Sequence, residues 1–275
     1  MTAWRLLELE TYDAFMNMAV DETILRARSQ SVVPNTLRFY RWNPSAVSVG
    51  RFQNLEKEVQ LDNCRKHNVD VVRRITGGGT VYHDAQDEIT YSVIATKGDL
   101  GAEDITTVYS KVYASLAEAL RTLSIDADFN QGTAKACPNL TVRGKKISGS
   151  AQAHGRGAFL QHGTLLTEVN LEKMFTFLRV PWAKTCMQVV NVAKNKITSI
   201  NAELRRKVSA EEVNDALVKG FAKALDVTFA SGRLTAGELE LSRRLCDEKY
   251  ATDDWNLCGR ADELKQEDFA RKVLR

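Results

Sequence analysis

The chain has 275 residues, of which 44% are hydrophobic, and its 38 basic and 35 acidic side chains leave a formal net charge of +3. This length can bury a substantial core in one large or two modest domains. The small net charge, without a lysine and arginine block, argues against nucleic-acid binding, and no apolar run approaches the roughly 20 residues that span a bilayer. Five scattered cysteines without a CxxC pair favour reduced thiols, so we expect a cytoplasmic protein that binds neither nucleic acid nor membrane.

The first half of the sequence alternates helix-like and strand-like patterns. Residues 15–28 carry apolar side chains at three-to-four spacing, which predicts a helix. Residues 36–42 and 46–50 are rich in strand-forming side chains and predict two strands, because the turn signal Asn-Pro-Ser at 43–45 separates them. Residues 105–123 again have helical apolar spacing and predict a helix packed on the core.

The second half adds a hairpin and two capped helices. Residues 140–142 and 145–147 flank an Arg-Gly pair, a two-residue connection typical of a β-hairpin. The sequences SAEE at 209–212 and TAGE at 235–238 are capping patterns that open two further helices. No linker or internal repeat divides the chain. We therefore predict an α+β fold with a mixed β-sheet core flanked by helices, the last of which close the back of the sheet.

The stretch RRITGGGTVYHD at residues 73–84 is the most informative part of the chain. Glycine lacks Cβ, so the three glycines at 77–79 allow main-chain NH groups to approach an anionic ligand closely. Arg73 and Arg74 have donor forks suited to carboxylate or phosphate, and the alternation of a strand turns one of them toward such a site. The structural alternative is a glycine-rich hairpin with solvated arginines.

Two more motifs follow this loop, GKKISGSAQ at 144–152 and LQHGTLL at 160–166, with EITYS at 88–92 between them. In order and spacing these motifs resemble the lipoate-protein ligase A family of the biotin/lipoate ligase superfamily. The resemblance covers nearly the whole chain and implies a biotin/lipoate ligase-like catalytic domain at 1–258, followed by a C-terminal helical tail at 259–275. It also implies the split type of ligase, whose accessory domain is a separate protein.

The resemblance assigns a site residue by residue. It makes Lys146 the catalytic cation, which holds the carboxylate and the α-phosphate together although they repel. The implied ATP contacts are Arg74, Gly79, Thr80, Val81, Tyr82 and Lys146. The implied lipoate contacts are Gly77, Gly78, Gly79, His83, Lys146, Gly149 and His162. The two histidines are equally open to being satisfied core residues.

Cofactors and the acyl pocket follow from the same resemblance. ATP is the expected co-substrate, with Mg²⁺ as its counterion, and the apolar face of Val81 and Tyr82 is expected to hold the eight-carbon acyl tail. Related ligases carry an acidic residue shortly before the catalytic lysine, where this chain has Asn139. We therefore assign no metal ligands.

Three functions are compatible with these motifs. The favoured one is an ATP-dependent lipoate-protein ligase, which forms lipoyl-AMP and transfers the lipoyl group to a lysine of an acceptor lipoyl domain, of the 2-oxoacid dehydrogenase E2 or glycine cleavage H type. The first alternative is an octanoyltransferase that moves octanoyl from acyl carrier protein through Cys137, nine residues before Lys146, without ATP. The second is a non-catalytic lipoyl- or nucleotide-binding module. The triple glycine favours the ligase.

Overall fold

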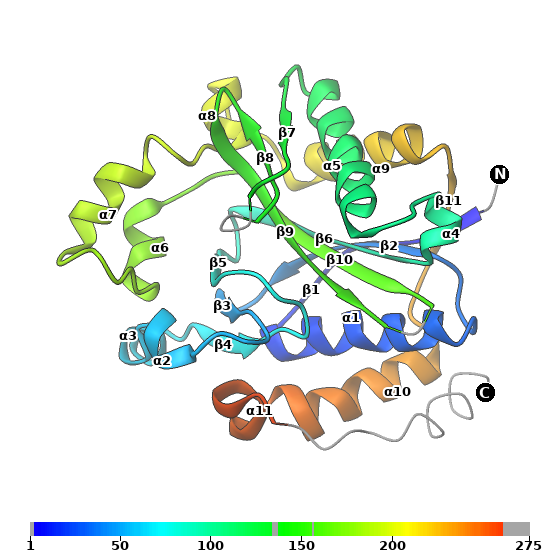
Figure 1. Ribbon diagram of the computed structural model, residues 1–275, viewed down its shortest axis with the longest axis horizontal. Coiled ribbons are helices and arrows are strands. Elements are labelled where there is room, and N and C mark those ends of the chain that lie inside the picture. Colours follow the sequence, from blue (N-terminus) through cyan, green and yellow to red (C-terminus); the bar gives the residue numbers. More distant parts are fainter. Residues whose placement is uncertain (1–2, 134–136, 156, 261–275) are drawn as a thin grey trace.

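The computed structural model describes residues 3–133, 137–155 and 157–260. Its main element is a mixed sheet of eight strands in the order β11-β1-β2-β6-β10-β9-β8-β7, and a smaller sheet, β4-β3-β5, lies beside it (Figure 1). The strands are β1 (Ala3–Tyr12), β2 (Thr36–Trp42), β3 (Ala46–Val49), β4 (Asp70–Arg73), β5 (Val81–His83), β6 (Glu88–Ala95), β7 (Asp128–Asn130), β8 (Asn139–Val142), β9 (Lys145–His154), β10 (Phe159–Leu166) and β11 (Thr228–Gly232).

Helices cover both faces of the large sheet (Figure 1). α5 and α9 lie together on one face, where their apolar stripes pack on strand residues such as Phe39 and Tyr91; α1 lies on the other face, where Ile24 packs near Leu160. The helices are α1 (Ala14–Ser29), α2 (Leu55–Glu58), α3 (Leu61–Lys66), α4 (Lys97–Leu100), α5 (Ile105–Thr122), α6 (Leu171–Phe177), α7 (Cys186–Ala193), α8 (Ile200–Leu204), α9 (Ala210–Leu225), α10 (Ala236–Leu245), the π-helix η1 (Cys246–Tyr250) and α11 (Asp253–Cys258). The predicted α+β class with a mixed sheet is confirmed.

The two capped helices near the C-terminus take different places. Ser209 accepts from the Glu212 backbone N–H and starts α9, which covers the sheet beside α5 as predicted. Thr235 and Glu238 form the predicted capping box of α10, but this helix packs against α1 rather than on the sheet. The buried ion pair of Glu238 with Arg5, at 2.7 Å, attaches only the first turn of α10 to strand β1. The prediction that both helices close the sheet is therefore wrong for α10.

The C-terminal segment wraps back to the glycine-rich stretch. The Trp255 indole donates to the Arg73 carbonyl at 2.8 Å, and the Arg73 guanidinium donates to carbonyls at the end of α11 and to the Gln53 carbonyl. The helix ends at Gly259, in the left-handed region at φ 68°. The predicted helical tail beyond it, from residue 261, lies outside the described residues. Within the described part of the chain, no helix has the length and apolarity needed to cross a membrane.

Candidate active site

A cavity opens where the glycine-rich loop approaches the large sheet. Part of its apolar lining comes from Met18, Tyr40 and Trp42, which belong to one buried cluster between α1 and β2. The remaining lining residues come from seven other segments: Ser48, Arg74, Gly78, Gly79, Thr80, Val81, His83, Thr90, Cys137, Pro138, Lys146, Gly149, Ser150, Ala151, His162, Gly163 and Thr164. The three motifs of the sequence thus meet around one space.

The triple glycine forms one wall, and its middle member has the special backbone. Gly78 has φ +87°, and a Cβ there would come within 3.3 Å of the Ala151 side chain. Gly50 is needed beside it, because a Cβ on Gly50 would fall 2.1 Å from the Gly78 carbonyl oxygen. Gly77 and Gly79 have open space around their Cα atoms and no positive φ. The conformational demand therefore falls on Gly78 and its neighbour across the loop.

Arg74 holds this loop from beneath. Its Nη2 donates to the carbonyls of Gly77 and Gly79 at 2.9 and 3.0 Å, its Nη1 donates to the Ser48 carbonyl and hydroxyl, both at 2.8 Å, and its Nε donates to the Thr76 hydroxyl at 3.2 Å. A guanidinium has five N–H donors, so all of them are used within the protein. Burial lowers the pKa of Arg74 to about 10, and the group still carries its charge at neutral pH.

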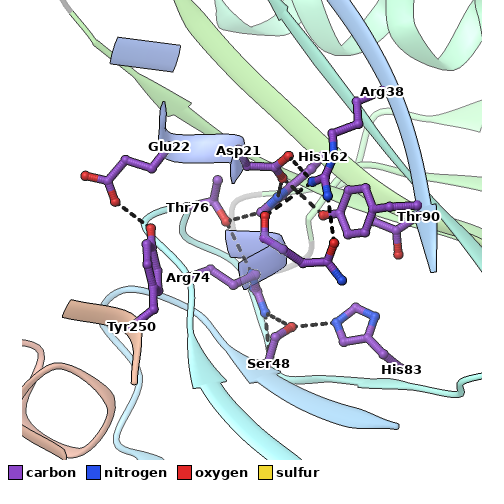
Figure 2. Close-up of polar contacts among 12 residues, drawn as sticks. Asp21, Glu22, Arg38, Ser48, Arg74, Thr76, His83, Thr90, His162 and Tyr250 are labelled. Carbon is purple, nitrogen blue, oxygen red and sulfur yellow. Dashed lines mark hydrogen bonds and ion pairs between the residues drawn. The ribbon is translucent and has the colours of Figure 1, made fainter. Parts of the chain in front are cut away.

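One buried relay runs from Arg74 through Ser48 to His83, as Figure 2 shows, and continues to the carboxylate of Glu88. Because Arg74 donates to the Ser48 hydroxyl, that hydroxyl is free to donate to His83 Nε2, 2.7 Å away. The His83 Nδ1–H then faces the Glu88 carboxylate at 2.7 Å. The ring is stacked on Trp42 at a centroid separation of 4.0 Å. These contacts place a histidine with both ring nitrogens hydrogen-bonded at the cavity wall.

A second relay of the same design runs through His162. Its Nε2 lies 2.8 Å from the Thr76 hydroxyl, which accepts from Arg74, and its Nδ1 lies 2.9 Å from Asp21. Burial lowers the pKa of His162, against the hydrogen bond and charge of Asp21. Burial alone would raise the pKa of Asp21, but the His162 hydrogen bond and the Arg38 charge outweigh it and lower that pKa. Both relays end at Arg74 and fix its position (Figure 2).

Arg73 confirms the expected alternation of the strand. Its guanidinium is buried on the opposite side, among the carbonyls of Gly50, Gln53 and Asn256. Arg74 alone of the pair therefore faces the cavity.

Lys146 brings a second cation to the cavity beside Arg74. Backbone bonds fix it at the start of β9, since its N–H donates to the Lys196 carbonyl at 2.8 Å and its carbonyl accepts from Thr198 at 2.9 Å. The side chain lies across Gly149, where a Cβ would fall 2.6 Å from the Lys146 amine. It is exposed to the cavity, yet enough protein surrounds it that burial lowers the pKa of the amine. Lys145 points away, and its amine donates to the Lys194 carbonyl.

Cys137 is an exposed thiol on the wall of the same cavity. Antiparallel pairing of Asn139 with Gly149 brings the start of β8 beside the glycine over which Lys146 lies. A charge on the Cys137 sulfur would raise the pKa values of Lys146 and Arg74, which burial lowers, so the three groups lie near one another. The hairpin thus places a nucleophilic side chain in the same cavity as two cations.

The structure places most, though not all, predicted site residues at the cavity. Lys146, Gly149, His83 and His162 line it together with Arg74, Gly78, Gly79, Thr80 and Val81. Tyr82 does not, because neighbouring strand residues point to opposite faces; its ring stacks on Phe177 in a separate cluster. Gly77 also lies outside the lining. The Tyr82 side chain therefore faces away from the cavity and Gly77 lies outside its lining, and the predicted ligand contacts of both residues stay predictions.

The donors of Arg74 contact the protein itself, whereas the sequence predicted a nucleotide contact. All five of its donors are engaged by the protein, so none is left for a phosphate. Its role is to shape the glycine loop and to add positive charge behind it.

The sequence prediction missed several lining residues. Met18, Tyr40, Trp42 and Ser48 come from segments that were predicted only as core helix and strands. Their apolar or small side chains carry no chemical motif, so only the fold could assign them to the site.

The structure shows no ligands for the expected Mg²⁺. In the described residues, no three His, Cys, Asp or Glu side chains gather in a way that could hold a metal.

Comparison with known proteins identifies the family. The sequence model of the lipoyl protein ligase A/B catalytic domain matches residues 13–222. The chain belongs to this family. Among solved structures, a bi-partite lipoate protein ligase of Thermoplasma acidophilum is 31% identical, with a TM-score of 0.83 over 96% of this chain and all of that one. A lipoate-protein ligase A bound with ATP is 31% identical, with a TM-score of 0.80 over 93% of this chain and 99% of that one.

The curated relatives correct the favoured function. Eight of them are named octanoyltransferase LipM and are 33–37% identical. That of Brevibacillus brevis is 35% identical over 94% of this chain and 99% of its own, and that of Kyrpidia tusciae is 37% identical over 93% and 99%. The interpretation as an ATP-dependent ligase, drawn from the triple glycine, is therefore wrong. The triple glycine instead forms one wall of the cavity, and Arg74 fixes the shape of this loop.

Proposed function

We propose that this protein is an octanoyltransferase that carries the acyl group on Cys137. It takes octanoyl from the thioester of acyl carrier protein and passes it to a lysine of an acceptor lipoyl domain. The observation that carries the proposal is the place of the Cys137 thiol, on the wall of the cavity that Lys146 also lines. The relatives named octanoyltransferase LipM support the choice of acyl group, and a solved relative is described with its E2 lipoyl domain, which supports the acceptor class.

The first half-reaction forms an acyl-enzyme. The Cys137 thiolate attacks the carbonyl of the octanoyl thioester, a new carbon–sulfur bond forms, and the carrier thiolate leaves. Lys146 is placed to give that thiolate its proton, because burial lowers the pKa of the amine and so favours proton release. The step ends with octanoyl-Cys137 and a neutral Lys146.

The second half-reaction restores the starting state. The acceptor lysine, arriving as the free amine, attacks the octanoyl-Cys137 carbonyl, an amide bond forms, and the Cys137 thiolate leaves. The proton lost by the attacking amine goes to Lys146, so the ammonium and the thiolate are regenerated together. No nucleotide is consumed. ATP, Mg²⁺ and a separate accessory protein belonged to the ligase mechanism, and this reaction needs none of them.

The cavity offers surface for the acyl chain. Met18, Trp42, Val81 and Ala151 present apolar side chains to it, and the burial of each methylene stabilises a bound chain by about 0.8 kcal/mol. Arg74 keeps the glycine loop over this space without using a donor on the ligand. Octanoate has no polar group along its chain, which fits this lining.

Intact-mass spectrometry tests the proposal. The protein is incubated with octanoyl carrier protein, without ATP, and then with a lipoyl domain. We expect an octanoyl adduct on the wild type, its loss on addition of the acceptor, and no adduct on Cys137→Ser, since serine is a far weaker nucleophile at neutral pH. Cys186→Ser, at another exposed thiol, is the matched control and should form the adduct normally. Transfer that requires ATP and lipoate, with no adduct, would refute the proposal.

A further inference from the structure

The Cys137 segment is tied to helix α5 by a buried phenol. Tyr113 is fully buried on α5, and its hydroxyl donates to the carbonyl of Pro138, the residue after Cys137, at 3.0 Å. We propose that Tyr113 is a positioning residue, which holds the Cys137 thiol in the cavity for acyl transfer. This inference rests on the proposed octanoyltransferase function and concerns how its nucleophile is placed.

A chain of hydrogen bonds across two strands fixes the direction of the Tyr113 proton. Gln152 donates to the Gln161 side-chain oxygen at 2.7 Å, and the Gln161 amide donates to the Ser150 hydroxyl at 3.0 Å. The Ser150 hydroxyl then donates to the Tyr113 oxygen at 2.8 Å. A carbonyl can only accept, so the single proton of Tyr113 points to Pro138. The sheet thereby supports the tether from behind.

The ring of Tyr113 has no room to follow a moving segment. It stacks on Phe129 at a centroid separation of 5.1 Å and on Tyr109 at 6.2 Å, with no exposed surface. If Pro138 moved away, the hydroxyl proton would remain buried without an acceptor, which opposes the movement. The tether is therefore rigid on the α5 side.

A second, weaker contact acts on the same segment. The Asn139 side-chain amide donates to the Cys137 carbonyl at 3.2 Å, a local contact within the same segment. The contact with Tyr113 differs because it joins Cys137 to a separate, fully packed helix. Attack on a thioester needs the sulfur at near-attack distance, and a misplacement of about 1 Å can cost a hundredfold in rate.

Tyr113→Phe tests the inference, because it keeps the ring stacking and removes only the proton donor. Steady-state kinetics with octanoyl carrier protein should show kcat reduced about five- to tenfold, with KM unchanged. Carbamidomethylation mapped by peptide mass spectrometry should show Cys137 reacting faster than in the wild type, relative to the exposed Cys186 in the same sample. Slower transfer from a more accessible thiol is not expected from a purely structural role. Tyr12→Phe, a tyrosine of β1 outside the cavity lining, is the matched control and should behave as the wild type.

Two further readings keep the outcome decisive. Buried Cys64 should stay protected from the reagent, which shows that the fold is intact. If Tyr113→Phe makes Cys64 reactive, the same measurements are made on Ser150→Ala. This variant should show a smaller decrease in kcat and a smaller increase in the labelling rate of Cys137. Wild-type kcat and an unchanged Cys137 labelling rate would overturn the inference. A wild-type protein that forms no octanoyl adduct on Cys137 would instead refute the proposed function, and the labelling result would still test the tether.

Discussion

One methyl group added at Gly149 should remove most of the activity and leave the fold intact. A Cβ at this position would lie 2.6 Å from both the Cε and the Nζ of Lys146, whereas ordinary contact begins at 3.4 Å. The amine must therefore move by about 0.8 Å or more. Gly149 also pairs with Asn139, two residues after Cys137, so the amine lies over the part of the hairpin that adjoins Cys137.

The size of the effect follows from this displacement. A shift of about 1 Å in a reacting group costs about a hundredfold in rate, which corresponds to about 2.7 kcal/mol in activation free energy. The folded state should not suffer, because the clash is with the far end of a flexible side chain and Gly149 has no positive φ. Alanine also disfavours the unfolded chain relative to glycine, so the free energy of unfolding should stay the same or rise slightly.

Single-turnover transfer of octanoyl to a lipoyl domain, with thermal unfolding in parallel, measures both quantities for Gly149→Ala. Gly98→Ala is the control, because a Cβ on Gly98 in α4 has no neighbour closer than 3.9 Å. Lys146→Ala sets the rate without the amine. A Gly149→Ala protein with the wild-type single-turnover rate would refute the reasoning, since it would mean that the position of the Lys146 amine does not limit transfer.

Three other predictions concern the same walls. Lys146→Ala should fold normally but lose transfer by about a hundred- to a thousandfold in kcat. Gly163→Ala should destabilise the protein by about 1–3 kcal/mol in urea unfolding, because its Cβ would fall 2.4 Å from the Gly149 carbonyl oxygen and 2.6 Å from the Tyr91 hydroxyl. Burial lowers the pKa of His162 from its ordinary 6.5, so the unfolded chain binds this proton more readily. The stability that depends on neutral His162 is therefore complete above about pH 6.5 and is lost as the pH falls below this value. The unfolding temperature of His162→Gln should therefore change less with pH, between about pH 8 and pH 5, than that of the wild type.

Local signals in the sequence predicted the elements that frame the site. Residues 15–28 form most of α1, and the predicted hairpin exists, with Arg143 and Gly144 at φ 48° and 77°, a positive-φ pair that suits a two-residue connection. Such features depend on neighbours in the chain, so periodicity and turn chemistry suffice to find them.

Side-chain direction was harder to predict. The alternation of a strand indicates that one of Arg73 and Arg74 faces the cavity but does not say which. The same rule separates Val81 from Tyr82, which the sequence prediction treated as one apolar face. Only the pairing of β5 with β3, which sets Tyr82 opposite Val47 in a small buried cluster, decides between the two.

The long-range contacts of the site left no mark in the sequence. Asp21 of α1 and His162 are 141 positions apart in the sequence, and the hydroxyl of Tyr113 on α5 donates to the Pro138 carbonyl. Asp21 and Tyr113 lie within helical patterns that are fully explained by core packing. Their partners are fixed by the way α1 and α5 pack on the sheet, which periodicity does not specify.

The motifs could not separate a ligase from a transferase because both reactions need the same cavity. Each must hold an eight-carbon chain and place a cation beside its carbonyl, and in the proposed site the cavity at the glycine loop and the amine of Lys146 would serve both reactions. The reactions differ in how the carbonyl is activated. A mixed anhydride with AMP needs no protein nucleophile, whereas a thioester donor needs a thiol that can exchange with it. Under the proposed function the discriminating feature is a single side chain, Cys137, which precedes β8 and lies on the cavity wall that Lys146 also lines.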